Sequence, residues 1–276
     1  MIDLHFHSNC SDGEFSPKEL SDLIKKSEIE YCSLTDHDNV DAYPEFINYF
    51  SNSSIRCFSG VELTALYKEQ EIHILSYNYN VNKVREILKK KEKITELKKI
   101  NELKLAIKLF KQNGFLVRDD LSVKKSQPVG LTIALDVYNN EKNFKKINGQ
   151  SEEQFYNEYQ AFGSSCYTER SGVSVAWIID NFKDSDLILA HPFNPVSFLV
   201  KPLGISDIKE IVSMGLDGIE VYHPDLNDEQ IKILENLVRE NDWYFTGGSD
   251  FHKQGKNKRL GYMDENLKIN SFKLYG

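Results

Sequence analysis

Short apolar segments that carry His, Asp or Glu, mostly at their C-terminal ends, are the feature that most constrains the fold of this sequence. Seven such segments lie at residues 2–7, 31–37, 56–63, 71–77, 187–193, 218–224 and 243–252. Helix-forming stretches separate many of them: Ser16-Pro17-Lys18-Glu19 resembles a capping box, and Asn227-Asp228-Glu229-Gln230 resembles another helix start. Alternating strands and helices favour a parallel sheet. Polar residues at seven strand ends favour a closed α/β barrel, because barrel active sites lie on that rim.

The histidines are confined to these segments. None of the seven lies in the long middle region, and they are His5, His7, His37, His73, His191, His223 and His252. Histidines that only fill a core would be spread along the chain. His5 and His7 point to the same face of a strand, where two neutral imidazoles can share a cation. The pattern therefore predicts a metal site at the strand ends.

Carboxylates complete this set. Glu62 ends the stretch Gly60-Val61-Glu62 and could bridge two cations, while Asp250 shares a strand face with His252. Asp12 lies in the loop after the first segment. Mixed His and carboxylate ligands suit Zn, Mn or Fe, and Mg is also possible. The four cysteines are scattered and form no C-x-x-C pair, which disfavours a zinc ribbon and suits a reducing compartment.

Three further polar residues near the strand ends each keep two interpretations. Asp36 and Asp38 flank His37, and they either orient an imidazole or are ordinary loop residues. His223 has a functional interpretation, in which it protonates a leaving group or contacts the substrate, and a structural one, in which it only bonds to its own loop.

The ordered motifs DLHFHSNCSDG, LTDHD, GVE, EIHILSY, LAHPF, GIEVYHP and GGSDFH resemble the polymerase and histidinol phosphatase (PHP) superfamily. The resemblance covers roughly residues 1–80 and 175–262. It implies a distorted (β/α)7 barrel with two to three divalent metal ions in a trinuclear centre. It assigns the first metal to His5, His7, Glu62 and Asp250, the second to Glu62, His73 and His191, and the third to Asp12, His37 and His252.

Residues 82–174 interrupt the strand pattern. From Lys83 to Lys111 the chain holds eleven Lys or Arg and four Glu, a net charge of +7 in a chain of net charge -8. Apolar residues recur there at steps of three and four, which predicts an amphipathic helix. The charge run is either a solvated face or a platform for a polyanion. We expect 82–174 to be a helical cap inserted into a barrel made of 1–81 and 175–276.

An insertion of this kind resembles the PHP subgroup that removes phosphate from nucleoside 5′- or 3′,5′-bisphosphates and trims RNA from a 5′-monophosphate end. The segment Cys166–Arg170 resembles one that presents a basic residue to the phosphate, which implicates Arg170. The subgroup usually has Arg, Pro and His together in its insertion, whereas the counterpart here, residues 128–132, contains no His. The basic loop 253–259 could meet a second phosphate through Lys256.

Together these features predict a phosphoric ester hydrolase that acts on nucleotides or on the 5′ ends of short RNA or DNA. Three alternatives are a small-molecule phosphatase of the histidinol-phosphate type, an amidohydrolase-like enzyme that cleaves a C–N bond, and a non-catalytic PHP module that binds nucleic acid. The sequence shows no bilayer-length apolar run and no signal peptide. We therefore expect a cytoplasmic protein without an obligate protein partner.

Overall fold

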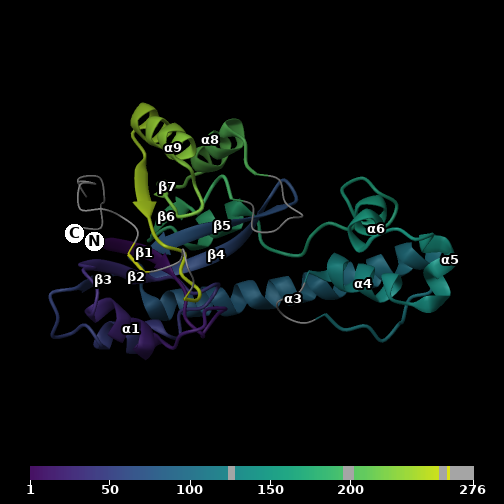
Figure 1. Cartoon of the computed structure of the whole chain (residues 1–276), viewed down its shortest axis with the longest axis horizontal. Coiled ribbons are helices and arrows are strands. Elements are labelled where there is room, and N and C mark those ends of the chain that lie inside the picture. The colour runs from purple at the N-terminus through teal and green to yellow at the C-terminus, as the bar shows by residue number, and fades with distance from the viewer. Residues whose placement is uncertain (124–127, 195–201, 255–259, 262–276) are drawn as a thin grey trace. The chain divides into compact units, whose positions relative to one another are not determined.

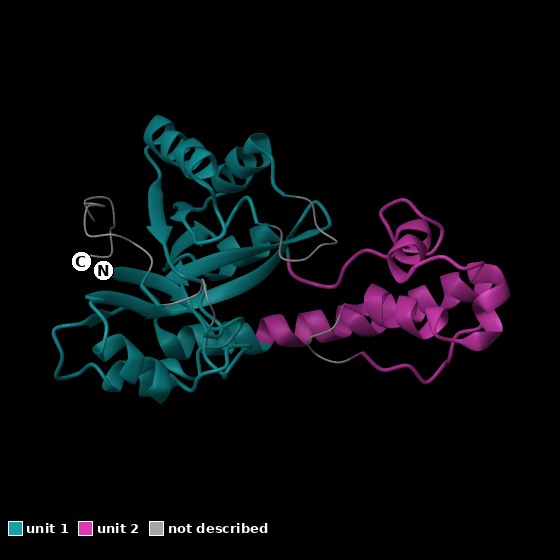
Figure 2. Ribbon diagram, in the orientation of Figure 1, with its two compact units in different colours: residues 1–89, 174–276 teal, residues 90–173 magenta. Residues whose placement is uncertain are grey.

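The structure, a computed structural model, describes residues 1–123, 128–194, 202–254 and 260–261. These residues form a mixed α/β arrangement (Figure 1). The chain divides into two compact units (Figure 2): unit 1 contains Met1–Lys89 and Ser174–Gly276, and unit 2 contains Lys90–Val173. Unit 1 therefore comes from two separate stretches of sequence, and unit 2 comes from the stretch between them.

Unit 1 contains two sheets. The three-stranded sheet has the order β1 (Ile2–Phe6), β2 (Tyr31–Leu34) and β3 (Arg56–Cys57), and its pairs are parallel. The five-stranded sheet has the order β4 (Gly60–Tyr67), β5 (Gln70–Tyr77), β6 (Asp186–Leu189), β7 (Gly218–Tyr222) and β8 (Tyr244–Gly247). In this sheet β5 is antiparallel to β4 and β6, whereas β6, β7 and β8 are parallel.

The direction of β5 makes the prediction of a wholly parallel sheet wrong. Lys68 and Glu69 alone connect β4 to β5, and both have positive φ (45° and 65°), so the connection is a hairpin and not a helical crossover. The described strands also do not close into a barrel. Two single backbone bridges, Phe6 to Phe251 and His37 to Glu62, connect the two sheets instead. The first brings the end of β1 to the segment that follows β8, and the second brings the segment that follows β2 to the start of β4.

The described helices of unit 1 are α1 (Pro17–Lys25), α2 (Tyr43–Asn48), α7 (Val175–Asn181), α8 (Ile205–Ser213) and α9 (Asp228–Asn241). Both helix starts expected from the sequence are capping boxes, at Ser16 and at Asn227. Helices α1 and α2 bury apolar side chains with Phe6 of β1 in one cluster. This packing holds the end of β1 in place, and the two histidines of the first segment lie there.

Helix α3 (Val81–Gln112) begins in unit 1 and continues into unit 2. It is followed by α4 (Val129–Tyr138), the 3-10 helix η1 (Glu141–Asn143), α5 (Phe144–Ile147) and α6 (Glu152–Tyr159). The core of unit 2 is aromatic, and the rings of Phe115 and Phe155 meet edge to face with centroids 5.5 Å apart. Among the described helices, none has the length and apolar character needed to cross a bilayer.

Candidate metal centre

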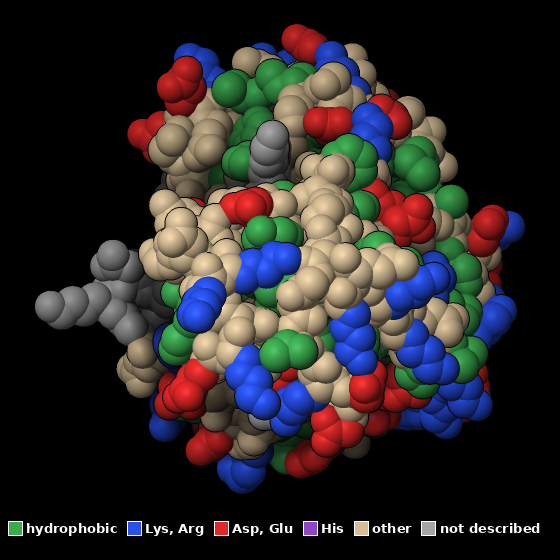
Figure 3. Space-filling view, turned by 90° about the vertical axis from the view of Figure 1, so that its right-hand side faces the viewer, with side chains coloured by type: hydrophobic (Ala, Val, Ile, Leu, Met, Phe, Trp, Pro, Cys, Tyr) green, Lys and Arg blue, Asp and Glu red, His purple; other side chains and the backbone are tan. Residues whose placement is uncertain are grey.

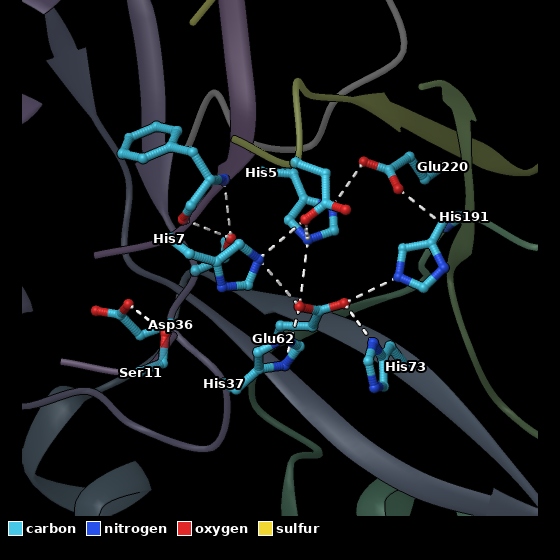
Figure 4. Close-up of polar contacts among 12 residues, drawn as sticks. His5, His7, Ser11, Asp36, His37, Glu62, His73, His191 and Glu220 are labelled. Atoms are coloured by element: carbon cyan, nitrogen blue, oxygen red, sulfur yellow. Dashed lines mark hydrogen bonds and ion pairs between the residues drawn. The ribbon is translucent and has the colours of Figure 1, made fainter. Parts of the chain in front are cut away.

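The carboxylate of Glu62 lies at the centre of the site. Its side chain is 1% exposed, and Oε1 lies 2.8 Å from His73 Nδ1 and 3.1 Å from His191 Nε2. Oε2 lies 3.1–3.3 Å from three further imidazoles (Figure 4), those of His37, His7 and His5. One buried anion therefore contacts five imidazoles that come from separate parts of the sequence.

Strand geometry explains how these side chains meet. Thr64 of β4 pairs with His73 of β5, so His73 is a diagonal cross-strand neighbour of Glu62. The backbone bridge from His37 to Glu62 brings the segment after β2 to the same strand. His5 and His7 project to one face at the end of β1, with ring centroids 5.2 Å apart.

Two aspartates flank this group. Asp250 Oδ1 lies 3.2 Å from His7 Nε2 and 3.5 Å from His5 Nε2. Asp12 Oδ1 lies 3.3 Å from His252 Nε2, and the side chain of Asp12 is 54% exposed, so the cluster is open to solvent at this end. The structure thus brings all the residues named from the sequence as metal ligands into one cluster in unit 1.

Within this cluster, candidate ligand atoms that lie within 4.8 Å of one another form three groups in the part of the chain that the structure describes. The groups are His7, Asp12, His37 and His252; His5, His7 and Asp250; and His37, Glu62 and His73. They differ from the sets implied by the family resemblance, because His7 and His37 each belong to two groups. His191 joins none of them, although it contacts Glu62.

The hydrogen bonding of the cluster fits a cation. Five of its buried polar atoms have no hydrogen-bond partner within the described residues: His5 Nε2, His7 Nδ1, His7 Nε2, Glu62 Oε2 and His73 Nδ1. His5 Nε2, His7 Nε2 and His73 Nδ1 lie 2.8–3.3 Å from oxygens of Glu62 without forming hydrogen bonds to them. An unpaired buried polar atom costs about 1–3 kcal/mol, so several together would be strongly unfavourable. Divalent cations would satisfy them, because neutral imidazoles and carboxylates are their usual ligands.

Protonation of the cluster follows from burial and from its neighbours. Burial alone would raise the pKa of Glu62, but the imidazoles of His73, His5 and His37 hold it well below its usual value. Burial lowers the pKa of His7, but Asp250 and Glu62 outweigh this effect and raise it to about 9. Burial lowers the pKa of His37 to about 4, so this imidazole is neutral at neutral pH. A metal must therefore displace a proton from His7 but not from His37.

The backbone around two of these residues is unusual. Asp250 and His191 have positive φ values of 47° and 26°, which few residues other than glycine adopt. Gly248 lies against β1 so closely that a Cβ there would be 2.5 Å from His5 N and 2.3 Å from His5 Cβ. The segment after β8 can approach the metal cluster because residue 248 has no side chain.

Glu220 is a site residue that the sequence analysis missed. It is fully buried on β7, and Oε1 lies 3.0 Å from His5 Nδ1, while Oε2 accepts a hydrogen bond of 2.9 Å from the backbone N–H of His191. A carboxylate behind an imidazole fixes the ring and makes it a better metal ligand. The signal was present, since Glu220 is a charged residue in the middle of an apolar strand, where unpaired charges are rare.

Asp36 and Asp38 hold backbone near the cluster. Asp36 accepts hydrogen bonds of 2.7 Å from Ser8 N, Ser8 Oγ and Ser11 Oγ. It therefore fixes the loop that follows β1, and the sequence had left open whether it orients an imidazole or is a loop residue. Asp38 Oδ1 accepts a hydrogen bond of 3.3 Å from Thr64 N on β4.

His223 is buried against the cluster, at 1% exposure. Its Nδ1 accepts a hydrogen bond of 3.2 Å from Asp225 N, so the proton of a neutral ring lies on Nε2. Nε2 is 3.4 Å from Asp250 Oδ2. The ring is therefore placed to orient Asp250, and it also bonds to its own loop, as one of the two sequence interpretations has it.

The sequence analysis also named two residues that would bind substrate phosphate. Arg170 belongs to unit 2, between α6 and α7, and Lys256 lies outside the described residues. The loop that carries Arg170 is held on both sides by Glu102 of α3, which is 9% exposed. Glu102 accepts hydrogen bonds of 3.0 Å from Ser171 N and 3.4 Å from Thr168 Oγ1.

Comparison with known proteins identifies the family. Residues 3–201 match the family model of the PHP domain, which is more than half of the chain. The chain belongs to the PHP domain family. This confirms the resemblance seen in the sequence motifs.

The PHP chain resembles one relative and one solved structure over most of its length, and another relative over about a quarter of it. It is 26% identical to a 5′-3′ exoribonuclease of Haemophilus influenzae over 91% of this chain and 89% of that protein. It is 34% identical to a 3′,5′-nucleoside bisphosphate phosphatase of Chromobacterium violaceum, over 27% of this chain and 26% of that protein. A structure described as a putative metal-dependent phosphoesterase from Bifidobacterium adolescentis has a TM-score of 0.62 at 20% identity, and covers 96% of this chain and 92% of its own. Family and relatives agree with the predicted enzyme class: the chain is a phosphoric ester hydrolase.

Proposed function

We propose that this PHP protein hydrolyses phosphomonoesters of nucleotides or of the 5′ ends of oligonucleotides, with two to three divalent cations in unit 1. The observation that carries the proposal is the buried carboxylate of Glu62 among five imidazoles, with buried polar atoms that have no hydrogen-bond partner within the described residues and that a cation would satisfy. The names of the exoribonuclease and bisphosphate phosphatase relatives support a nucleotide or RNA end as substrate. For the fold, we propose that the two sheets are the halves of the family's distorted barrel and that unit 2 is its inserted cap.

The ligands would be the nine residues of the cluster, with Glu62 shared between cations. Bound divalent cations would lower the pKa of a water molecule to about 7 and neutralise charge on the phosphoryl oxygens. The chain's own residues keep this site preorganised. Glu220 fixes the His5 ring, and His223 holds Asp250.

Substrate binding in this proposal involves unit 2. Arg170 would form a bidentate contact with a phosphate, which a guanidinium does well because its N–H groups match two oxygens. Lys256 would contact a second phosphate. Glu102 positions the Arg170 loop through Ser171 and Thr168. Substrates with two phosphates, or with a phosphodiester beside the terminal phosphate, suit this set of residues.

The test is phosphate release from a substrate panel by protein loaded with Mn, Zn or Mg. The panel holds nucleoside 5′-monophosphates, 3′,5′-bisphosphates, 5′-phosphorylated RNA and DNA oligonucleotides, and histidinol phosphate. We expect turnover on the nucleotide or oligonucleotide members. Preferred turnover of histidinol phosphate would replace the proposal with the small-molecule alternative. No phosphate release with any metal, together with RNA binding, would favour a non-catalytic module.

A further inference from the structure

A groove on the surface of unit 2 lies along the second half of α3. Its volume is about 490 Å³, and it is lined by Lys104, Ile107, Lys108, Lys111, Gln112 and Asp119. It is separate from the residues of the candidate metal centre, which all belong to unit 1.

The three lysines of the groove share one face of the helix. Lys104, Lys108 and Lys111 are spaced by four and three residues, so their side chains are neighbours. Lys111 is paired with Asp119 at 2.5 Å. Neither Lys104 nor Lys108 has an ion pair in the part of the chain that the structure describes. Like charges at this spacing destabilise a helix slightly, and a bound anion would remove that repulsion.

The basic surface extends beyond the groove. Lys146 of α5 donates a hydrogen bond to the backbone carbonyl of Asn113, next to Gln112, and lies 4.6 Å from the centre of the Phe115 ring. Figure 3 shows several Lys and Arg side chains, with Asp and Glu side chains among them, on the face that it draws. Residues 90–173 contain fifteen basic and eleven acidic residues, whereas the rest of the chain contains nineteen and thirty-one. Unit 2 is thus the basic part of an acidic protein.

We infer that this groove binds the phosphodiester backbone of a single-stranded polynucleotide. The lysines neutralise phosphates, and Ile107 with the lysine stems offers an apolar floor for sugar or base. Lysines one turn apart on a helix face can each contact a successive phosphate of a polynucleotide. A mononucleotide would contact only one of these lysines. The inference rests on the proposed function for the identity of the substrate, and it makes oligonucleotides the preferred class.

Binding is measured by fluorescence anisotropy with a single-stranded RNA that has a 5′-hydroxyl end and therefore no terminal phosphate to hydrolyse. The variant is Lys104→Gln/Lys108→Gln/Lys111→Gln. The control is Lys26→Gln/Lys209→Gln/Lys232→Gln, which makes the same change in net charge on exposed lysines of unit 1. A third protein carries arginine at the three groove positions. Melting temperatures of all proteins show that each is folded.

We expect the glutamine variant to bind RNA at least about tenfold more weakly than the wild type. The slope of log K against log salt concentration should be smaller in magnitude by about 2, because each phosphate contact in a single strand contributes about 0.7. The unit 1 control and the arginine variant should bind like the wild type. DNA of the same length tests whether the 2′-hydroxyl matters, and polyglutamate tests whether any polyanion is accepted.

The outcomes separate this inference from the proposed function. Wild-type protein that binds RNA through these lysines but releases no phosphate from any substrate would remove the proposed function and leave the groove assignment. Wild-type protein that hydrolyses nucleotides, with a glutamine variant that keeps wild-type RNA affinity and salt slope, would overturn the groove assignment. Equal binding of polyglutamate would also overturn it, because an acidic polypeptide would then fit as well as a nucleic acid.

Discussion

At the level of single residues, Glu62 shows how one side chain can require a metal. A carboxylate at 1% exposure is stable only if opposite charge or hydrogen bonds replace its water. The five imidazoles around Glu62 must be neutral to bind cations. Once metal is bound, these imidazoles would therefore not neutralise the negative charge of Glu62. Shared cations would resolve this conflict, and the sequence feature that indicates it is the placement of histidines at strand ends.

The first prediction follows from this shared position. Glu62→Gln keeps the shape of the side chain but removes the anion between the candidate cation sites. We expect less bound metal and at least a hundredfold loss of phosphatase activity, because losing even an outer partner of a metal ligand costs about 10–100-fold. Elemental analysis and phosphate release measure the two effects. Glu240→Gln, on the exposed face of α9, is the matched control. Normal metal content and turnover in Glu62→Gln would rule out the bridging role.

A second residue-scale prediction concerns Gly248. A Cβ at this position would lie 2.5 Å from His5 N, which is closer than two such atoms can approach. Gly248→Ala should therefore push His5 out of place and destabilise the fold by about 1–3 kcal/mol, the usual cost of overpacking. Thermal unfolding and metal content measure this. Gly204→Ala is the control, because a Cβ there meets Asp207 only at ordinary contact distance. Equal melting temperatures for the two variants would contradict the packing argument.

The candidate ligands could be identified from the sequence because two signals coincide: the residues are His, Asp or Glu, and they lie at the ends of predicted strands. For Glu220 the sequence offered only a charge in an apolar strand. The role of Glu220 depends on a contact with His5, between β7 and β1, and no local pattern encodes that contact. The sequence left open whether Asp36 orients an imidazole or is a loop residue, and it did not point to the serines that bond to this aspartate. The serines that bond to Asp36 are distant in sequence, and serine hydroxyls leave no periodic signal.

At the level of elements, strands are present where the sequence has apolar runs. The direction of β5 could not be predicted from the alternation of strands and helices alone. Hairpins are usually recognised by Asn-Gly or Asp-Gly turns. Here Lys68 and Glu69 adopt positive φ without such a signature, and β4 and β5 extend further toward each other than their apolar runs suggest. The consequence is functional, because the hairpin register is what sets His73 beside Glu62.

The element-scale prediction concerns the contact between α3 and the loop of Arg170. Glu102→Ala removes the acceptor for Ser171 and Thr168, so the loop should lose its fixed position. If Arg170 binds phosphate, Arg170→Ala should lower kcat/KM by roughly tenfold to a hundredfold, from a charged contact of about 1.5–3 kcal/mol. Glu102→Ala should reproduce part of that loss, mainly in KM. The double variant should be little worse than Arg170→Ala.

Glu96→Ala is the control for this prediction, because Glu96 is an exposed residue on the same helix. Glu102→Gln, which keeps one oxygen acceptor, should restore part of the activity. Fully additive effects of Glu102→Ala and Arg170→Ala would mean that Glu102 does not act through Arg170. In that case the loop is held by other contacts, such as the hydrogen bond of 2.6 Å from Lys98 Nζ to Gly172 O.

At the level of the whole molecule, charge and chemistry are divided between the two units. The carboxylates and imidazoles that would hold cations lie in unit 1, whereas unit 2 is net basic. The change from apolar segments to a lysine-rich run near residue 82 is visible in the sequence. The point at which unit 2 begins is not visible, because α3 is one continuous helix across it.

The last prediction tests whether metal binding is part of the stability of this architecture. A ligand that binds only the folded state stabilises it by about 2.7 kcal/mol at a hundred times its Kd. For a chain of this size we therefore expect Mn or Zn, added to chelator-treated protein, to raise the melting temperature by roughly 5–10 °C. Calorimetry should show the shift in the transition of unit 1, since the candidate ligands all lie there. Glu62→Gln should shift much less. A melting temperature that does not depend on metal would show that the unpaired atoms of the cluster are satisfied in another way, and it would count against the metal centre itself.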